Sequence, residues 1–207
     1  MIRTARETDA AAIAEIYWPY VADTFISFED TPPDAQQMRS RLAEGLERFP
    51  WLVSETDGRI DGYAYASQHR TRAAYRWSVD VSAYVRSEVQ RRGIGRALYS
   101  TLLPLLARQN YKNAFAGIAL PNDASVGLHE CMGFLPIGVY RDVGFKLGVW
   151  RDVGWWGITL NPSPQGLAEP VDFSSLPTSR ERSYETFPMG AKIRNVAPEN
   201  GSKWGLS

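Results

Sequence analysis

One stretch near the middle of the chain limits the possible folds more than any other, because a strand pattern runs there into a glycine-containing basic turn. Apolar and polar residues alternate from Val79 to Val85, and residues 90–96 read Gln-Arg-Arg-Gly-Ile-Gly-Arg. Apolar residues then recur at helical spacing as far as Gln109. Backbone amides at the start of such a helix converge on one point. The stretch therefore predicts an anion-binding turn between a strand and a helix.

Two widespread nucleotide-binding motifs do not fit this turn. A dinucleotide fingerprint needs a third glycine three residues after the second, but Leu98 stands there. The Gly-Lys-Ser or Gly-Lys-Thr end of a P-loop does not occur in the chain. Instead, Arg91 and Arg92 precede the first glycine, which suits a diphosphate held by amides, a helix dipole and guanidinium groups. Taken alone, two such arginines are more often a solvated helix start.

Composition narrows the remaining classes of protein. The 207 residues are 44% hydrophobic, which is enough for a sizeable core, and 23 Lys and Arg balance 23 Asp and Glu. The chain therefore has no excess of positive charge that would favour binding to nucleic acid. The single cysteine, Cys131, gives neither a disulfide framework nor a metal-ligand cluster. No signal-peptide core and no run of about 18 apolar residues occurs, so we expect a cytoplasmic protein with no membrane segment and no metal.

The first 160 residues contain the patterns of seven strands and four helices. Asp57-Gly58 predicts a tight hairpin between two strands, Asn122 is a helix cap, and Pro104 predicts a kink or frayed turn. After Leu160 sustained periodicity is lost, so we expect residues 161–207 to form an irregular tail. The expected strands are residues 2–5, 51–56, 60–67, 79–85, 112–120, 134–140 and 149–160. The expected helices are one capped by Thr8 with its apolar positions within residues 12–20, and residues 34–49, 93–109 and 122–132.

Five blocks in this order resemble the GNAT N-acetyltransferases, and within them the phosphinothricin acetyltransferase group: PWLVSETDGRIDGYAYAS, RAAYRWSVDVSAYV, QRRGIGRALY, LPNDASVGLHECMGF and VGFKLGVWRDVGWW. The resemblance covers residues 1–160 and leaves the tail without a counterpart. It implies an α/β (α+β) GNAT acyl-CoA N-acyltransferase fold. In that fold a central mixed, mostly antiparallel twisted sheet is flanked by helices.

The resemblance also implies acetyl-CoA as co-substrate and assigns its binding residues. The backbone of the strand before the turn is expected to hydrogen-bond the pantetheine arm as an added strand would. The turn is expected to cradle the pyrophosphate, and the helix after Pro121 to contact the pantetheine and thiol end. The implied cofactor residues are Ala83, Tyr84, Val85, Arg91, Arg92, Gly93, Ile94, Gly95, Arg96, Asn122 and Ser125.

Two side chains are implied as the acid and base of acetyl transfer. Asp80 stands where the phosphinothricin group usually has a glutamate base; it is one methylene shorter, which favours a bridging water. His129 stands where many GNAT enzymes have a general-acid tyrosine, and an imidazole of pKa near 6.5 can donate to the leaving sulfur or act as a second relay. The alternatives are a strand aspartate that fixes a turn and a structural helix histidine.

The resemblance implies a small amine acceptor of the phosphinothricin or methionine sulfone/sulfoximine type. Arg72 and Tyr75 match substrate-contacting positions, Phe28 matches an aromatic wall, and Arg70 adds charge, although loop arginines are often merely solvated. An acetyltransferase for protein or peptide amines and a non-catalytic acyl-CoA-binding protein stay open. Members of this group are commonly homodimers, and the aromatic segment Val149–Trp156 suits a subunit contact, a site wall or core packing.

Overall fold

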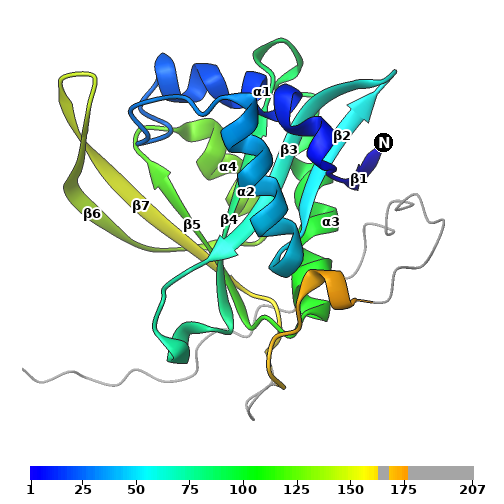
Figure 1. Cartoon of the computed structure of the whole chain (residues 1–207). Coiled ribbons are helices and arrows are strands. Elements are labelled where there is room, and N and C mark those ends of the chain that lie inside the picture. Colours follow the sequence, from blue (N-terminus) through cyan, green and yellow to red (C-terminus); the bar gives the residue numbers. More distant parts are fainter. Residues whose placement is uncertain (163–167, 177–207) are drawn as a thin grey trace, which may run out of the picture.

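A seven-stranded sheet carries helices on both of its faces (Figure 1). The computed structural model describes residues 1–162 and 168–176. The strands are β1 Ile2–Thr4, β2 Trp51–Thr56, β3 Arg59–Gln68, β4 Ser78–Val85, β5 Asn113–Ala119, β6 Leu135–Lys146 and β7 Val149–Thr159. The helices are α1 Ala10–Ala22, α2 Ala35–Arg48, α3 Ile94–Arg108 and α4 Asp123–Cys131, with 3-10 turns η1 Glu7–Asp9, η2 Ala73–Tyr75, η3 Ser87–Val89 and η4 Phe173–Ser175.

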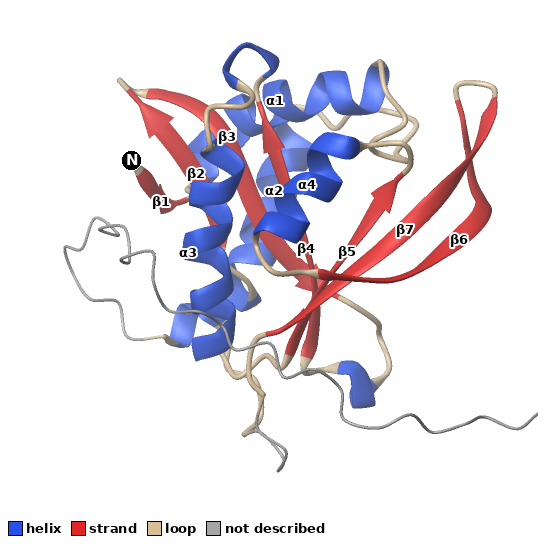
Figure 2. Cartoon of the chain, turned by 180° about the vertical axis from the view of Figure 1, so that it is seen from behind, coloured by secondary structure: helices blue, strands red, loops and turns tan. Residues whose placement is uncertain are grey.

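The sheet has the order β1-β2-β3-β4-β5-β7-β6, and of its neighbouring strand pairs only β4 and β5 run parallel. This confirms the expected mixed, mostly antiparallel sheet flanked by helices. Helices α1 and α2 cover one face, and α3 and α4 lie on the other, as Figures 1 and 2 show from opposite sides. Strand alternation directs Val79 and Val81 of β4 into the core that contains α3. Asp80 and Tyr84 consequently lie on the face covered by α1.

Strands β4 and β5 stay paired over only three positions, the last of which joins Asp80 and Phe115. Beyond this point β4 continues to Val85 beside β3, and β5 continues to Ala119 beside β7. Figure 2 shows the two strands diverging from their common end. Backbone groups on the facing edges of the two strands therefore have no ladder partner across the gap.

Strand β6 is longer than the sequence predicts. We expected it to end at Tyr140, but it runs to Lys146 with an irregular register between Tyr140 and Gly144. Asp142 at the irregularity has φ of 46°, and its N–H donates to the Asp152 carboxylate at 2.9 Å. Asp142 interrupts the alternation of apolar residues in β6, but the pairing of β6 with β7 continues beyond it. The long β6–β7 hairpin consequently projects beyond the rest of the sheet (Figure 1).

Helix α3 begins directly after Gly93, whose φ of 81° favours glycine. Gly93 and the basic residues before it form the turn predicted from the sequence. The helix continues through Pro104 to Arg108, so the expected frayed turn is absent. At the start of α4, Asn122 acts as the predicted cap, since its Oδ1 accepts from the Ser125 N–H at 3.1 Å.

The first part of the predicted tail that the structure describes packs on the domain. Gln109 Nε2 donates to the Val171 carbonyl at 2.8 Å, and the Val171 N–H donates to the Gln109 carbonyl at 3.1 Å. Trp77 Nε1 donates to the Ala168 carbonyl at 3.0 Å, and Phe173 in η4 packs against the core next to α2. Residues 163–167 and 177–207 lie outside the described part of the chain.

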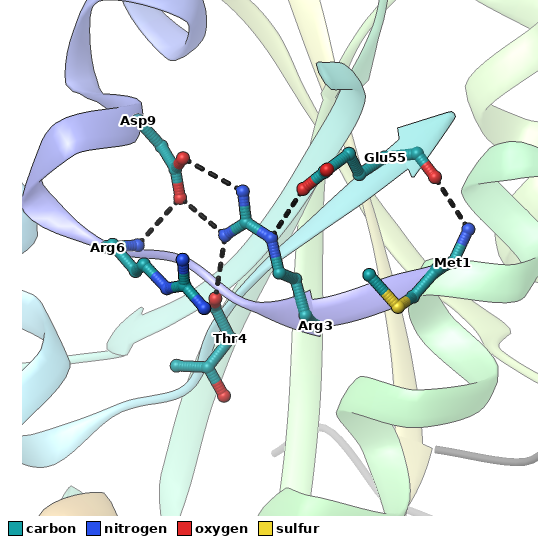
Figure 3. Close-up of polar contacts among 6 residues, drawn as sticks. All are labelled: Met1, Arg3, Thr4, Arg6, Asp9 and Glu55. Atoms are coloured by element: carbon teal, nitrogen blue, oxygen red, sulfur yellow. Dashed lines mark hydrogen bonds and ion pairs between the residues drawn. The ribbon is translucent and has the colours of Figure 1, made fainter. Parts of the chain in front are cut away.

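The N-terminal strand is tied down by the guanidinium of Arg3 (Figure 3). It donates to Asp9 at 2.7 and 2.9 Å and to Glu55 at 2.6 Å. The amino group of Met1 donates to the Glu55 carbonyl at 2.6 Å. This network fixes β1 against β2 and against the turn that leads into α1.

A buried lysine anchors the loop between α1 and α2 to the β6–β7 hairpin. The Lys146 ammonium donates to the carbonyls of Val21 at 2.6 Å, Ser27 at 2.6 Å and Glu29 at 2.7 Å. Only 7% of Lys146 is exposed. Three charge-assisted hydrogen bonds therefore offset the desolvation of this ammonium and hold the loop in one place.

Replacing Lys146 with methionine preserves much of the side-chain volume but removes the donor for three carbonyl oxygens. We expect the free energy of unfolding in urea to fall by about 2–4 kcal/mol, because each buried acceptor left unpaired costs about 1–3 kcal/mol and loss of the buried charge offsets part of this. Arg39→Met on the exposed face of α2 is the control, with an expected change below about 0.5 kcal/mol. Equal stability of Lys146→Met and wild type would contradict the anchoring role.

Candidate functional site

A cavity of about 610 Å³ occupies the gap where β4 and β5 part. Its wall includes residues of α3 and α4 on one side of the sheet and Tyr20 and Ile26 on the other. The cavity thus reaches both faces of the sheet. The residues predicted from the sequence that line it are Ala83, Tyr84, Val85, Arg91, Gly93, Ile94, Gly95, Arg96, Asn122, Ser125 and His129.

The glycine turn forms one end of this cavity. Amides at the start of α3 have no intrahelical partner there, and the helix dipole adds positive potential. Gly95 allows α4 to approach, because a Cβ at this position would lie 3.0 Å from the Leu128 side chain. Arg91 and Arg96 belong to the cavity wall, whereas Arg92 is exposed and lies outside it. Among the predicted cofactor residues, Arg92 alone is not brought to the cavity.

The end of β4 is held by α1 and by the turn. The Tyr20 hydroxyl donates to the Val85 carbonyl at 2.5 Å, and Gln90 Nε2 donates to the Tyr20 hydroxyl at 3.0 Å. These bonds keep the Ala83–Val85 backbone at the cavity edge. An extended ligand there can pair with the edge as an additional strand does.

His129 lies on the α3 side of the sheet and is only 5% exposed. Its Nδ1 donates to the Ser125 carbonyl at 2.7 Å, and its Nε2 accepts from the Tyr99 hydroxyl at 3.1 Å, the tautomer that satisfies both partners. Burial lowers the pKa of His129 below its ordinary value. The imidazole is therefore a neutral, firmly oriented group, and both of its nitrogens already have partners within the chain.

Asp80 lies on the opposite face of the sheet from His129, and the structure pairs it with His69. His69 Nδ1 lies 2.7 Å from Asp80 Oδ1. Burial raises the pKa of the Asp80 carboxyl, and the hydrogen bond from His69 and the charge of Arg70 oppose that rise. The two residues predicted as base and acid are consequently separated by the sheet.

Sequence reasoning did not single out His69, although a signal was present. It follows β3 directly, and the β3–β4 register places Ser67 opposite Asp80. Strand alternation puts His69 on the same face as Ser67. Extending the predicted antiparallel pairing past residue 67 would have brought the histidine to the aspartate.

Aromatic rings surround His69 and fix its orientation. Ring centroids of Phe115, Tyr75 and Trp155 lie 4.6, 6.1 and 6.0 Å from the His69 ring. Arg70 stacks over Trp155 at 5.5 Å. Among the described residues, Trp155 Nε1 is buried without a hydrogen-bond partner. A cluster with donors and aromatic walls therefore adjoins the carboxylate of Asp80.

The predicted acceptor residues take different places around this face. Tyr75 belongs to the aromatic cluster, and Arg72 is exposed at the start of η2. Phe28 lies on the loop anchored by Lys146, with its ring against Gly144 of β6. The structure thus brings Tyr75 next to the Asp80–His69 pair, whereas no contact joins Phe28 or Arg72 to that pair among the described residues.

The described residues provide neither a metal-ligand cluster nor a membrane-spanning helix. Residues 1–162 and 168–176 contain no group of three or more His, Cys, Asp or Glu side chains arranged to hold a metal ion. Within the same ranges, no helix is both long and apolar enough to cross a membrane.

Comparisons with known proteins agree with this architecture. The family described as "Acetyltransferase (GNAT) domain" matches residues 2–155. A phosphinothricin N-acetyltransferase of Streptomyces viridochromogenes is 39% identical over 171 residues, which cover 82% of this chain and 93% of that protein. An L-methionine sulfoximine/L-methionine sulfone acetyltransferase of Salmonella typhimurium is 35% identical over 161 residues, which cover 77% of this chain and 94% of that protein.

A solved structure is similar along nearly the same length. The crystal structure of a GNAT superfamily phosphinothricin acetyltransferase from Sinorhizobium meliloti, in complex with AcCoA, superposes with a TM-score of 0.79 at 32% identity. The match covers 83% of this chain and 94% of that one. With the seven-stranded sheet and the cavity between β4 and β5, these matches show that the chain belongs to the GNAT acetyltransferases, in the group of phosphinothricin and methionine sulfoximine/sulfone N-acetyltransferases.

Proposed function

We propose that this protein transfers the acetyl group of acetyl-CoA to the amino group of a small amino-acid-like acceptor. One observation carries the proposal: the cavity in the gap between β4 and β5 is lined by the glycine turn on the α3 side and by Ser82 and Tyr84, which share a sheet face with Asp80. A cofactor and an acceptor approaching from opposite faces can meet in such a gap. The acetyl-CoA bound to the Sinorhizobium meliloti relative supports the choice of donor.

The residues present suit three parts of acetyl-CoA, namely its pyrophosphate, its pantetheine arm and its thioester end. Amides at the start of α3 with Arg91 and Arg96 suit the pyrophosphate, since guanidinium groups and helix N-termini both favour anions. The exposed edge at Ala83–Val85 suits the amides of the pantetheine arm. Asn122 and Ser125 stand toward the thioester end in this arrangement.

Acetyl transfer requires two proton movements. The acceptor ammonium must lose a proton before its nitrogen forms a bond to the acetyl carbon, and the C–S bond then breaks to release a thiolate that takes a proton. We assign the first task to the Asp80 side of the sheet and place His129 beside the departing sulfur. Because both nitrogens of the neutral His129 are already bonded within the chain, we expect the Ser125 hydroxyl to donate to the thiolate and His129 to position Ser125.

The acceptor class follows from the groups on the Asp80 face. Phosphinothricin and methionine sulfone or sulfoximine combine a carboxylate with a tetrahedral polar head, and both need cationic and N–H donors. Arg70, Arg72, Tyr75 and the indole N–H of Trp155 supply such donors, with Phe28 as an aromatic wall. The named activities of the Streptomyces and Salmonella relatives support this class.

Subunit assembly and location remain predictions. The β6–β7 hairpin exposes large apolar side chains, including Phe145 and Trp150 at 59% and 57%. Contact with a second copy would cover them, which supports the homodimer predicted from the sequence. We expect the enzyme to act in the cytoplasm.

The two arginines before Gly93 form a matched pair for testing the pyrophosphate site. We expect Arg91→Gln to weaken acetyl-CoA binding about 5- to 10-fold at low salt, because it removes one charge-assisted contact, and the difference should shrink as salt screens it. Arg92→Gln, which lies outside the cavity wall, should change the Kd less than about 2-fold by the same electrostatic argument. Calorimetric titration measures both, and equal effects of the two substitutions would contradict this assignment.

A panel of amines with acetyl-CoA tests the function directly, with thiol release as the readout. We expect phosphinothricin, methionine sulfone and methionine sulfoximine to be acetylated with kcat/KM values at least about 10-fold above those of ordinary amino acids, a difference of roughly 1.4 kcal/mol in transition-state binding. Peptides with free N-termini are included. Acetylation of peptides but not of free amino acids would favour the protein-modifying alternative, and binding of acetyl-CoA without any transfer would favour a non-catalytic one.

A further inference from the structure

We propose that His69 is the proton acceptor for the substrate amine, and that Asp80 orients it. This inference rests on the proposed function and identifies the group that bridges Asp80 to the amine. Its starting point is geometric, since His69 Nδ1 lies 2.7 Å from Asp80 Oδ1. A carboxylate on Nδ1 holds the imidazole in the tautomer whose Nε2 carries the lone pair.

The remaining nitrogen of His69 is available for this task. Within the described part of the chain, Nε2 of His69 has no hydrogen-bond partner. The side chain is 13% exposed, so the ring is largely enclosed but still reachable. His129 differs in this respect, because both of its nitrogens are bonded within the chain. Of the two histidines in the sequence, His69 is the one able to accept a proton from a ligand.

Packing fixes the ring in place. Phe115 lies 4.6 Å away on β5, while Tyr75 and Trp155 contact it edge-on from η2 and β7. These contacts and the bond to Asp80 hold the imidazole from several sides. A base held in one orientation loses little entropy when the acceptor binds, which favours proton transfer.

The pair also resolves a difficulty with the aspartate. Asp80 is one methylene shorter than the glutamate expected at this position, so by itself it would need a water to reach the amine. The imidazole spans that distance with a group that is part of the fold. The charged and titratable groups around the pair are Arg70, Tyr75 and Tyr65, and Arg70 favours the ionised form of the Asp80 carboxyl.

The proposed step transfers one proton and one acetyl group. Nε2 takes one proton from the acceptor ammonium, and the Asp80 carboxylate stabilises the imidazolium that results. The freed amine nitrogen forms a bond to the acetyl carbon as the C–S bond breaks. The thiolate is released as CoA after it takes a proton, and the imidazolium returns its own proton to solvent.

His69→Asn separates this role from a structural one. The asparagine amide can still donate to Asp80 as Nδ1 does, but it has no group that accepts a proton at the position of Nε2. We expect kcat/KM with the best acceptor to fall about 100-fold or more, with the acetyl-CoA Kd unchanged within about 2-fold of the wild type, since no cofactor contact is removed. Asp57→Asn in the exposed β2–β3 turn is the control for unchanged activity.

The pH profile supplies a readout that a structural role would not change. Wild-type kcat/KM should decline as pH falls, because a protonated pair cannot accept the substrate proton. In His69→Asn the remaining acceptor is the Asp80 carboxyl, so the acidic limb of the kcat/KM profile should move to lower pH. Asp80→Asn should also lower kcat/KM, and the double variant should lose little more than either single variant, because the two residues act as one unit.

Nitrogen-15 NMR of the two histidines tests the pair without any substrate, with His69→Asn assigning the signals. We expect the neutral His69 ring to be protonated at Nδ1 in the wild type and to lose that preference in Asp80→Asn. A ring protonated at Nε2, or an active enzyme whose rate and acidic limb are unaffected by His69→Asn, would overturn the role of His69. Wild-type inactivity toward every amine would instead overturn the proposed function, and with it this role.

Discussion

The parting of β4 and β5 after Asp80 is the feature on which the rest of the site depends. The parallel pairing of β4 with β5 stops after three positions, although both strands continue beyond it. The Tyr20 hydroxyl bonds the carbonyl and N–H of Val85, and the other backbone groups along the facing edges have no ladder partner, so a ligand with amides of its own can pair with them. The gap also joins the two faces of the sheet, so groups on either face can act on the same ligand.

Specific contacts or turns fix each element around the gap. Gly93 in the left-handed region starts α3 with its amides directed at the cavity, and Tyr20 ties the end of β4 to α1. Lys146 holds the α1–α2 loop against the β6–β7 hairpin through three carbonyls. These anchors lie on elements far apart in the sequence. Together they hold the walls of the cavity in position.

Local patterns predicted much of this architecture. Three of the predicted features each depend on residues close together in the sequence, and the structure has all three: the Asp57-Gly58 turn, the Asn122 cap and the strand-turn-helix around Gly93. Features that depend on contacts across the fold were missed. The pairing of β6 beyond Tyr140 depends on contacts with β7, and the burial of Lys146 has no sequence signal because lysines are nearly always exposed. The pairing of His69 with Asp80 required the β3–β4 register to be extended past the predicted strand.

Hydrogen exchange with and without acetyl-CoA measures most directly whether the cofactor enters the gap between β4 and β5. The account predicts slower exchange of the Ala83–Val85 amides and of those at the start of α3 when acetyl-CoA is present, because the pantetheine and pyrophosphate would pair with them. The amides of the β2–β3 turn should exchange at an unchanged rate. Protection confined to other parts of the chain, or none at saturating acetyl-CoA, would contradict the account.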